Sequence, residues 1–96
     1  MFAAYEPDFG KVNWNWCGHV CIQLHEIEEL LELPTRAELF LKSAREYEVV
    51  GYTSERKFVA ITFTLQADRL VIENVNLPSY ESIRDVIIRQ FLAETE

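Results

Sequence analysis

The chain has few of the residues that mark disulfide-rich, collagen-like or disordered proteins. Its 96 residues include only three glycines, three prolines and two cysteines, whereas apolar residues make up 49%. These numbers exclude a collagen-like repeat, a low-complexity linker and a disordered tail, and two cysteines fit a reduced interior better than a disulfide framework. No apolar run reaches the length of a membrane span, and no charged-then-apolar leader opens the chain. We therefore expect a single domain over residues 1–96, cytoplasmic and without a membrane partner.

Basic residues are also scarce. Nine lysines and arginines stand against sixteen acids, which gives a formal net charge of −7. A protein that holds nucleic acid through its phosphates needs a basic stripe, and none is visible, so the charge disfavours RNA as a partner. Residues 24–32 carry four of the acids, and this run predicts the solvated face of a helix. The alternative is a docking surface for a basic protein. The four are Glu26, Glu28, Glu29 and Glu32.

The first half of the chain predicts a short strand and two helices. Residues 2–5 are apolar and predict an edge strand, after which Asp8 is placed to cap a helix. The apolar stripe of that helix would be Phe9, Val12 and Trp16. A second helix is expected over residues 24–33 and should stop at Pro34.

The second half predicts a β-meander and a last helix. Residues 37–41, 45–52, 57–66 and 70–76 read as strands joined by short turns. Ser79 is expected to cap the last helix, with an apolar stripe formed by Ile83, Val86, Ile87 and Phe91. The expected fold class is α+β, a small antiparallel meander with helices packed on one face.

Four side chains that could bind a metal lie within nine residues, and they are Cys17, His19, Cys21 and His25. Their spacing is not a usual zinc pattern and lacks a paired C-x-x-C. The cysteines are therefore expected to be small buried hydrophobes and the histidines to lie near the surface. No metal or cofactor is predicted, and a metal-binding regulator is the least favoured hypothesis.

Aromatic residues crowd the first quarter of the chain at Tyr5, Phe9, Trp14 and Trp16. Stacking on single-stranded bases needs neighbouring arginine or lysine, which this segment lacks. The rings are expected to lie in the core, or to contact another chain.

Lys11, Asn15 and His19 follow one another at i, i+4 and i+8, which would align them on one stripe of the first helix. A cation, an amide and a group that titrates near neutral pH could hold a phosphate and move a proton. The same pattern is also typical of a solvated helix face.

The same residues carry a family resemblance. Asp8-x2-Lys11-x3-Asn15-x3-His19, preceded by a short strand, resembles the opening of the BrnT-type toxins of type II toxin–antitoxin systems, W-D-x-x-K-x-x-x-N-x-x-K-H-G-V. The glutamate-rich helix stands where that family has its second helix. Residues 46–53 are similar to its R-Y-x-x-I-G-R-T strand, and the two strands after it also have counterparts. The resemblance covers most of the chain.

The resemblance implies a RelE-like α+β ribonuclease fold and a toxin that cleaves RNA until an antitoxin protein binds it. It implies that His19 transfers the proton, that Lys11 supplies charge and that Asn15 orients the substrate. Tyr52 and Gly18 stand where the family has basic residues. RNA cleavage is therefore expected to be attenuated or lost, which leaves open whether the chain is an enzyme.

The alternative is a non-catalytic protein-interaction module on the same scaffold. In that hypothesis Trp14, Trp16 and the glutamate-rich helix hold another protein or a second copy of the chain.

Overall fold

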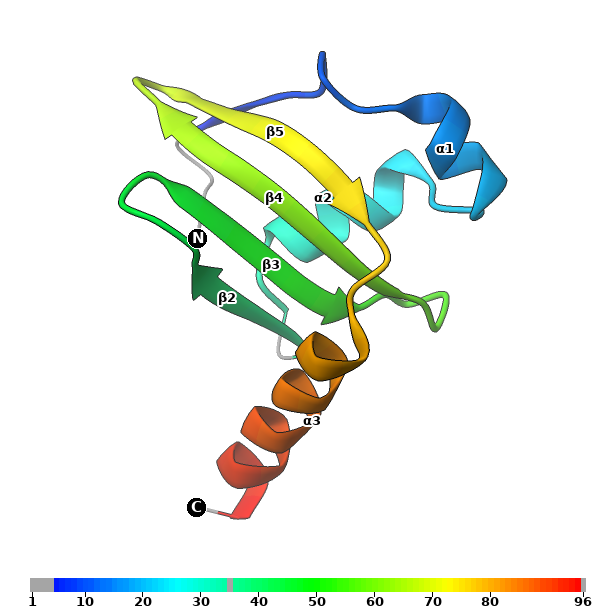
Figure 1. The fold of residues 1–96 in the computed structure, drawn as a ribbon, viewed down its shortest axis with the longest axis vertical. Helices are drawn as coiled ribbons and strands as arrows, with labels where there is room; N and C mark the ends of the chain where they lie inside the picture. The colour runs from blue at the N-terminus through cyan, green and yellow to red at the C-terminus, as the bar shows by residue number, and fades with distance from the viewer. Residues whose placement is uncertain (1–4, 35, 96) are drawn as a thin grey trace.

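The computed structural model describes residues 5–34 and 36–95. Within these residues the chain forms three helices and one five-stranded sheet, which confirms the expected α+β class (Figure 1). The strands are β1 (Glu6–Asp8), β2 (Ala37–Leu41), β3 (Glu46–Tyr52), β4 (Phe58–Gln66) and β5 (Arg69–Asn76). The helices are α1 (Trp14–His19), α2 (Leu24–Leu31) and α3 (Tyr80–Thr95).

The strand order is β1-β5-β4-β3-β2. β2 to β5 pair antiparallel in succession, as the predicted meander requires, and β1 adds to the edge by pairing parallel with β5. The segment with α1 and α2 therefore carries the chain from one edge of the sheet to the other before the meander returns it (Figure 1). The strand predicted at residues 2–5 lies largely outside the described residues, and the observed β1 begins at Glu6.

The main core lies between the sheet and α2. Alternate residues of β4 point to that side because side chains of a strand alternate between its faces, and Val59, Ile61 and Phe63 are completely buried there. Ile27 and Leu30 of α2 are buried against them. This is the apolar contact that holds the domain together.

Gly51 of β3 marks the tightest approach in this core. A Cβ atom built on it would lie 2.6 Å from the Cβ of Ala37 and 2.8 Å from Cδ2 of Leu30. Glycine at this position lets β2 and α2 close on β3 at the same place.

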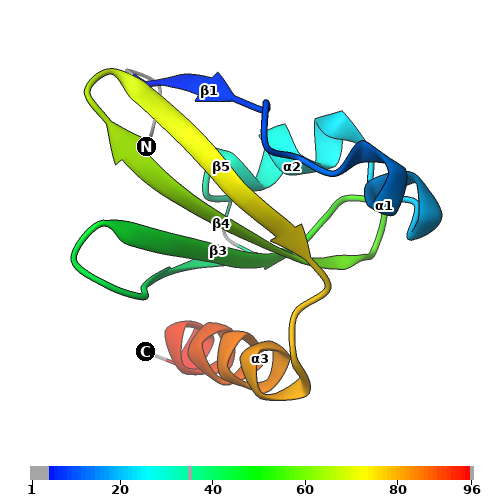
Figure 2. The same cartoon turned by 45° about the horizontal axis from the view of Figure 1, so that its top comes forward.

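The third helix lies on the other side of the sheet. Figure 2 shows α1 and α2 on one face and α3 on the opposite face, whereas the sequence predicted all helices on one face. A second, small cluster joins α3 to the sheet through Val86, Val50 and Ala60, with Phe40 packed beside it. The predicted cap is confirmed, because the amide of Ser82 donates to Oγ of Ser79 at 3.2 Å.

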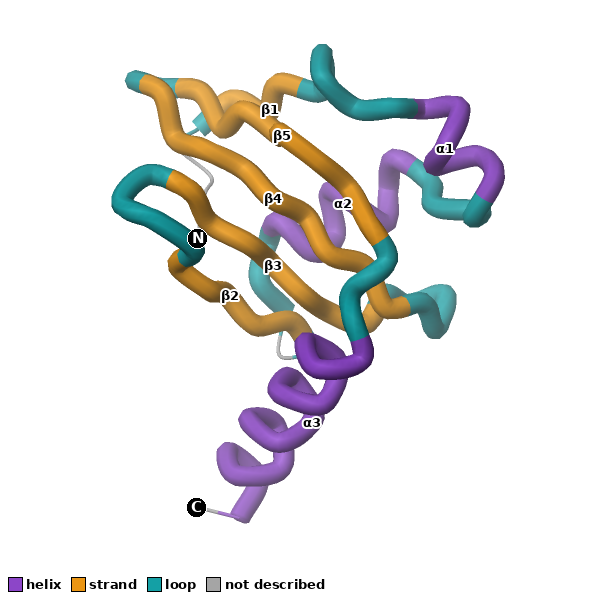
Figure 3. Tube along the Cα trace, in the orientation of Figure 1, coloured by secondary structure: helices purple, strands orange, loops and turns teal. Residues whose placement is uncertain are grey.

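The start of α1 differs from the prediction. Asp8 ends β1 and its Oδ1 accepts from the amide of Gly10 at 2.9 Å, which forms a turn instead of a helix cap. Figure 3 shows the loop between β1 and α1. The cap is Asn13, whose Oδ1 accepts from the amide of Trp16 at 3.1 Å. The helix therefore begins five residues later than Asp8 would have placed it.

No helix in residues 5–34 and 36–95 is both long enough and apolar enough to cross a bilayer.

Candidate functional site

The three predicted catalytic residues do not share one helix stripe. Asn15 and His19 lie on α1 and are exposed, but Lys11 precedes the helix because Asn13 caps it. The predicted i, i+4, i+8 alignment is therefore wrong for Lys11. Its ammonium group instead reaches β5, where Nζ lies 2.8 Å from Oε2 of Glu73.

Glu73 joins Lys11 to the exposed face of the sheet. Its Oε1 accepts from the hydroxyl of Thr64 at 3.1 Å, and Oγ1 of Thr64 in turn accepts from the side-chain Nε2 of Gln66 at 3.2 Å. The hydrogen bond from Lys11 is the main reason that the pKa of Glu73 lies below its ordinary value. Lys11 thus already neutralises a carboxylate, which reduces the charge that it could offer to a phosphate.

Most other cations are engaged in the same way. Six of the nine lysines and arginines form ion pairs with carboxylates, and Arg89 lies over the ring of Phe40, 4.4 Å from its centroid. The remaining pairs are Arg36–Glu29, Lys42–Glu48, Lys57–Glu26, Arg69–Asp8 and Arg84–Asp85. Across the part of the chain that the structure describes, these pairs leave no continuous basic surface of the kind that phosphate binding needs.

The four side chains considered as metal ligands point to different surroundings. Cys17 is buried in the core, and burial raises the pKa of its thiol, which disfavours the thiolate that metals bind. Cys21 is exposed, and Nε2 of His25 lies 3.2 Å from Oε1 of Glu55. Among the described residues, no three His, Cys, Asp or Glu side chains gather where they could hold a metal ion.

The glutamate run does not form a uniformly solvated face, which corrects the sequence prediction. Glu28 and Glu32 are exposed, but Glu26 is completely buried and Glu29 is half-buried. Oε2 of Glu26 accepts from the amide of Gln23 at 2.8 Å and so satisfies a free donor at the start of α2.

Glu26 also binds the loop between β3 and β4. Its Oε1 lies 3.1 Å from Nζ of Lys57 and accepts from the hydroxyl of Thr53 at 3.3 Å. Lys57 donates in addition to the main-chain carbonyl of Cys21. Partial burial lowers the pKa of Lys57, but its hydrogen bond to Glu26 and the nearby charges outweigh this, so the net shift is upward.

Glu29 makes a second connection to the same loop. Its Oε1 accepts from Arg36 and from the amide of Ser54, each at 2.6 Å, and its Oε2 accepts from the Ser54 hydroxyl at 2.8 Å. Chiefly through the Arg36 hydrogen bond, the pKa of Glu29 is lowered. We call Glu26, Glu29, Arg36, Thr53, Ser54 and Lys57 the α2–loop network. Because the polar groups of this network bind one another, the network holds the β3–β4 loop against α2 and leaves no free side chain for catalysis among its members.

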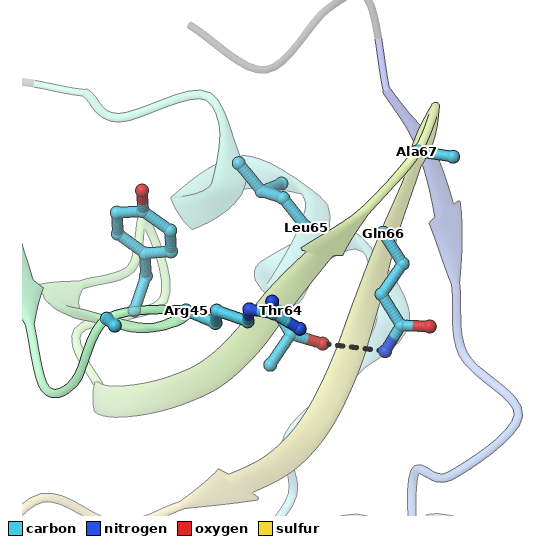
Figure 4. Close-up of a pocket in the computed structure, with 7 residues that line it drawn as sticks. Arg45, Thr64, Leu65, Gln66 and Ala67 are labelled. Atoms are coloured by element: carbon cyan, nitrogen blue, oxygen red, sulfur yellow. Dashed lines mark hydrogen bonds between the residues drawn. The ribbon is translucent and has the colours of Figure 1, made fainter.

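A shallow hollow of about 530 Å³ opens at the end of the sheet where β3 begins and β4 ends. Figure 4 shows Arg45, Thr64 and Gln66 along it, with the hydrogen bond between the last two drawn as a dashed line. Arg45 forms no ion pair with any described residue, but Thr64 is already bonded to both Gln66 and Glu73. One exposed arginine in an open hollow does not amount to a built site.

The outward face of α3 is the strongest candidate for a functional surface. Val86 is only 1% exposed, whereas Ile87 and Ile88 are 54% and 47% exposed, and Tyr80 and Phe91 are 81% and 63% exposed. At 100° per residue, the last four side chains fall on the side of the helix that points away from the sheet. We call Tyr80, Ile87, Ile88 and Phe91 the α3 apolar face.

Comparison with known proteins adds no relative. No family model, curated protein or solved structure matches this chain. Function is therefore argued from the residues and their geometry.

The sequence located the last helix but misassigned the role of its apolar residues. Ile87 and Phe91 were expected to pack in the core, yet both are exposed. The spacing of α3 does separate Tyr80, Ile87, Ile88 and Phe91 from Val86, the residue that packs against the sheet. A helix with apolar residues on two sides predicts two contacts, and this sheet supplies one of them.

Proposed function

We propose that this protein is a non-catalytic protein-interaction module whose docking surface is the α3 apolar face. One observation carries the proposal: four large apolar side chains lie on one helix face, each between 47% and 81% exposed. They expose on the order of 500 Å² of largely apolar surface, which lies in the upper range of the largest patch on an ordinary monomer. Patches of this size commonly serve to bind other molecules.

The sequence placed this contact elsewhere. Trp16 is half-buried against the core and Glu26 is completely buried, so neither offers the surface that the interaction hypothesis assigned to the tryptophans and the glutamate-rich helix. Trp14 remains exposed, 6.2 Å from the ring of Phe9 between centroids. A single exposed ring is a smaller contact than the α3 apolar face, which is why we assign docking to α3.

The test is the size of the complex that the protein forms in an extract of the cells that make it. We expect an assembly larger than the 11.3 kDa chain, lost when Ile87 and Phe91 are both replaced by glutamate. Leu24→Glu is the control, because Leu24 of α2 is 44% exposed and receives the same kind of substitution, an apolar side chain replaced by a carboxylate. A chain that runs at its own mass both in the extract and, when purified, at high concentration would refute the proposal, as would equal loss of the assembly in the control.

A second candidate is the toxin-type activity that the family resemblance implies, with an antitoxin-like protein as partner and RNA as substrate. It is supported by the exposure of Lys11, Asn15 and His19, since a substrate could reach all three side chains. The pairing of Lys11 with Glu73 and the net charge of −7 weigh against it.

This candidate is tested by RNA cleavage with the purified chain at neutral pH. Cleavage that Lys11→Ala and His19→Ala both abolish, while Lys42→Ala leaves it intact, would make the protein a ribonuclease. Lys42 is a suitable control because it is an exposed lysine paired with Glu48, at the end of β2 and far in sequence from α1. We expect no cleavage above background from any of the four proteins.

A further inference from the structure

The exposed residues of α3 have a symmetric spacing. Arg84 stands three residues before Ile87, and Phe91 stands three residues after Ile88. A two-fold axis through the midpoint between Ile87 and Ile88 would therefore exchange the position of Ile87 with that of Ile88. The same axis would exchange the position of Arg84 with that of Phe91. In an antiparallel helix pair around that axis, Ile87 faces Ile88 of the other helix and Arg84 faces Phe91.

Space beside α3 is available for a second helix. The helix starts near the end of β3 and runs beyond the β2 edge of the sheet (Figure 1). Figure 2 shows its outer side turned away from the sheet and from α1 and α2. An approaching helix can therefore lie along α3 without meeting the rest of the domain.

We propose that the occupant of the α3 apolar face is a second copy of this chain, docked with its own α3 antiparallel across a two-fold axis between Ile87 and Ile88. This inference rests on the proposed function and names its partner. Each copy contributes the same face, so both Ile87–Ile88 contacts and both Arg84–Phe91 contacts form together.

The Arg84–Phe91 contact is chemically sound. A guanidinium over an aromatic ring is favourable, and α3 already makes one such contact through Arg89 and Phe40. Arg84 is exposed, and its nearest carboxylate oxygen belongs to Asp85 at 3.8 Å, a loose surface pair that an interface can replace. Arg84 would thus lie within the interface with its charge over the other copy's ring.

The charge distribution permits two acidic chains to associate here. α3 contains two arginines and three acids, so it carries only −1 of the net −7. The remaining negative charge lies on other elements, and an antiparallel α3 pair keeps those elements away from the axis. Long-range repulsion is screened beyond about 10 Å at ordinary ionic strength.

The area sets the expected strength. About 500 Å² from each copy gives a total of about 1,000 Å², which reaches the lower limit of specific interfaces. A small interface with few polar contacts predicts a reversible dimer with a dissociation constant in the micromolar range.

The test is sedimentation equilibrium of the purified full chain from about 1 to 200 µM, a range that brackets micromolar dissociation. We expect the mass to rise from 11.3 kDa towards twice that value. Ile87→Glu should remain monomeric throughout, while Leu24→Glu should behave as the wild type. Phe91→Leu keeps an apolar side chain but removes the ring from both symmetric contacts, so it should raise the dissociation constant roughly five- to thirtyfold.

The antiparallel register is tested by disulfide formation in a Cys21→Ser background. Chains with Arg84→Cys mixed with chains with Phe91→Cys should form a mixed disulfide more readily than either forms alone. Preferential cross-linking of like positions would refute the register. Far-UV circular dichroism confirms that each variant is folded.

Three results would overturn the inference. Together they distinguish the failure of the inference from the failure of the proposed function. A purified chain that is monomeric at every concentration, beside a larger α3-dependent assembly in the cell extract, would mean that the partner is another protein. Monomers in both experiments would refute the inference and the proposed function together. A dimer that Ile87→Glu leaves intact would place the interface away from α3.

Discussion

The helix α2 and the helix α3 use their surfaces in opposite ways. α2 buries Ile27, Leu30 and a glutamate against the sheet and binds the β3–β4 loop through the α2–loop network. In residues 80–92, the part of α3 whose burial is described, Val86 alone is completely buried, and large apolar side chains point outwards. The acidic helix α2 is therefore packed into the domain, whereas most of the large apolar side chains of α3 face away from the domain core.

This contrast shows that charge and hydrophobicity alone do not predict which surface is available for binding. A buried carboxylate is stable only when partners compensate the loss of water, and Glu26 has Lys57, Thr53 and the amide of Gln23. Among the side chains of residues 5–34 and 36–92, no fully buried nitrogen or oxygen lacks a hydrogen-bond partner. An exposed apolar face has no such internal compensation, so it gains stability only from another molecule.

The largest effect is expected from breaking the α2–loop network. Glu26→Ala removes the carboxylate that Lys57, Thr53 and the Gln23 amide share, and leaves Lys57 partly buried without its main counter-charge. The free energy of unfolding should fall by about 3 kcal/mol, measured by urea denaturation.

Glu28→Ala is the control for that measurement, because Glu28 is an exposed acid on the same helix. Its effect should stay within about 0.5 kcal/mol. Equal effects of the two substitutions would mean that the network does not stabilise the fold and that α2 and α3 differ less than we infer.

Two adjacent residues of α3 provide the next comparison. Val86→Ala removes methyl groups from a closed contact with Val50 and Ala60 and should cost about 2 kcal/mol. Ile87→Ala, measured at a protein concentration low enough to prevent association, should change the free energy of unfolding by no more than about 0.5 kcal/mol. The same Ile87→Ala variant should weaken association at high concentration. If Ile87→Ala destabilised the monomer as much as Val86→Ala, the outward face would be part of the core.

Much of the fold could be predicted from the sequence because it depends on local patterns. The alternation of apolar residues in 57–66 places β4, and Ser79 after Pro78 starts α3, as the structure confirms. The start of α1 was predicted wrongly, because the cap was assigned to Asp8 alone. The structure uses Asn13, because Asp8 closes a turn with Gly10.

The candidate sites were harder to predict because they depend on contacts between distant residues. Little in the local sequence distinguishes Glu26, which contacts Lys57 of a loop thirty-one positions away, from the exposed Glu28. The capping-box spacing of Gln23 and Glu26 was the one available indication. The outward direction of Ile87 and Phe91 likewise depends on which side of α3 the sheet covers. Helical spacing groups residues into stripes, but it does not determine which stripe faces the sheet.

A smaller, pH-dependent effect is expected within the α2–loop network itself. The pKa of Glu29 is lowered below its ordinary value of 4.5 in the folded chain, first because Arg36 donates to it. A lowered folded-state pKa means that the ionised carboxylate stabilises the fold above the unfolded-state pKa. This contribution is lost as the pH falls through the lower, folded-state value.

Glu29→Gln should therefore flatten the dependence of stability on pH below about pH 5, which urea denaturation at successive pH values measures. Glu32→Gln is the control, because Glu32 is exposed at the end of the same helix and should leave the slope almost unchanged. The effect should be below about 1 kcal/mol, since both Glu29 and Arg36 are partly exposed and water screens their attraction. An unchanged slope in Glu29→Gln would show that Arg36 and Ser54 hold the loop without its charge. The α2–loop network would then depend on Glu26 alone, and the contrast with α3 would rest on one buried carboxylate.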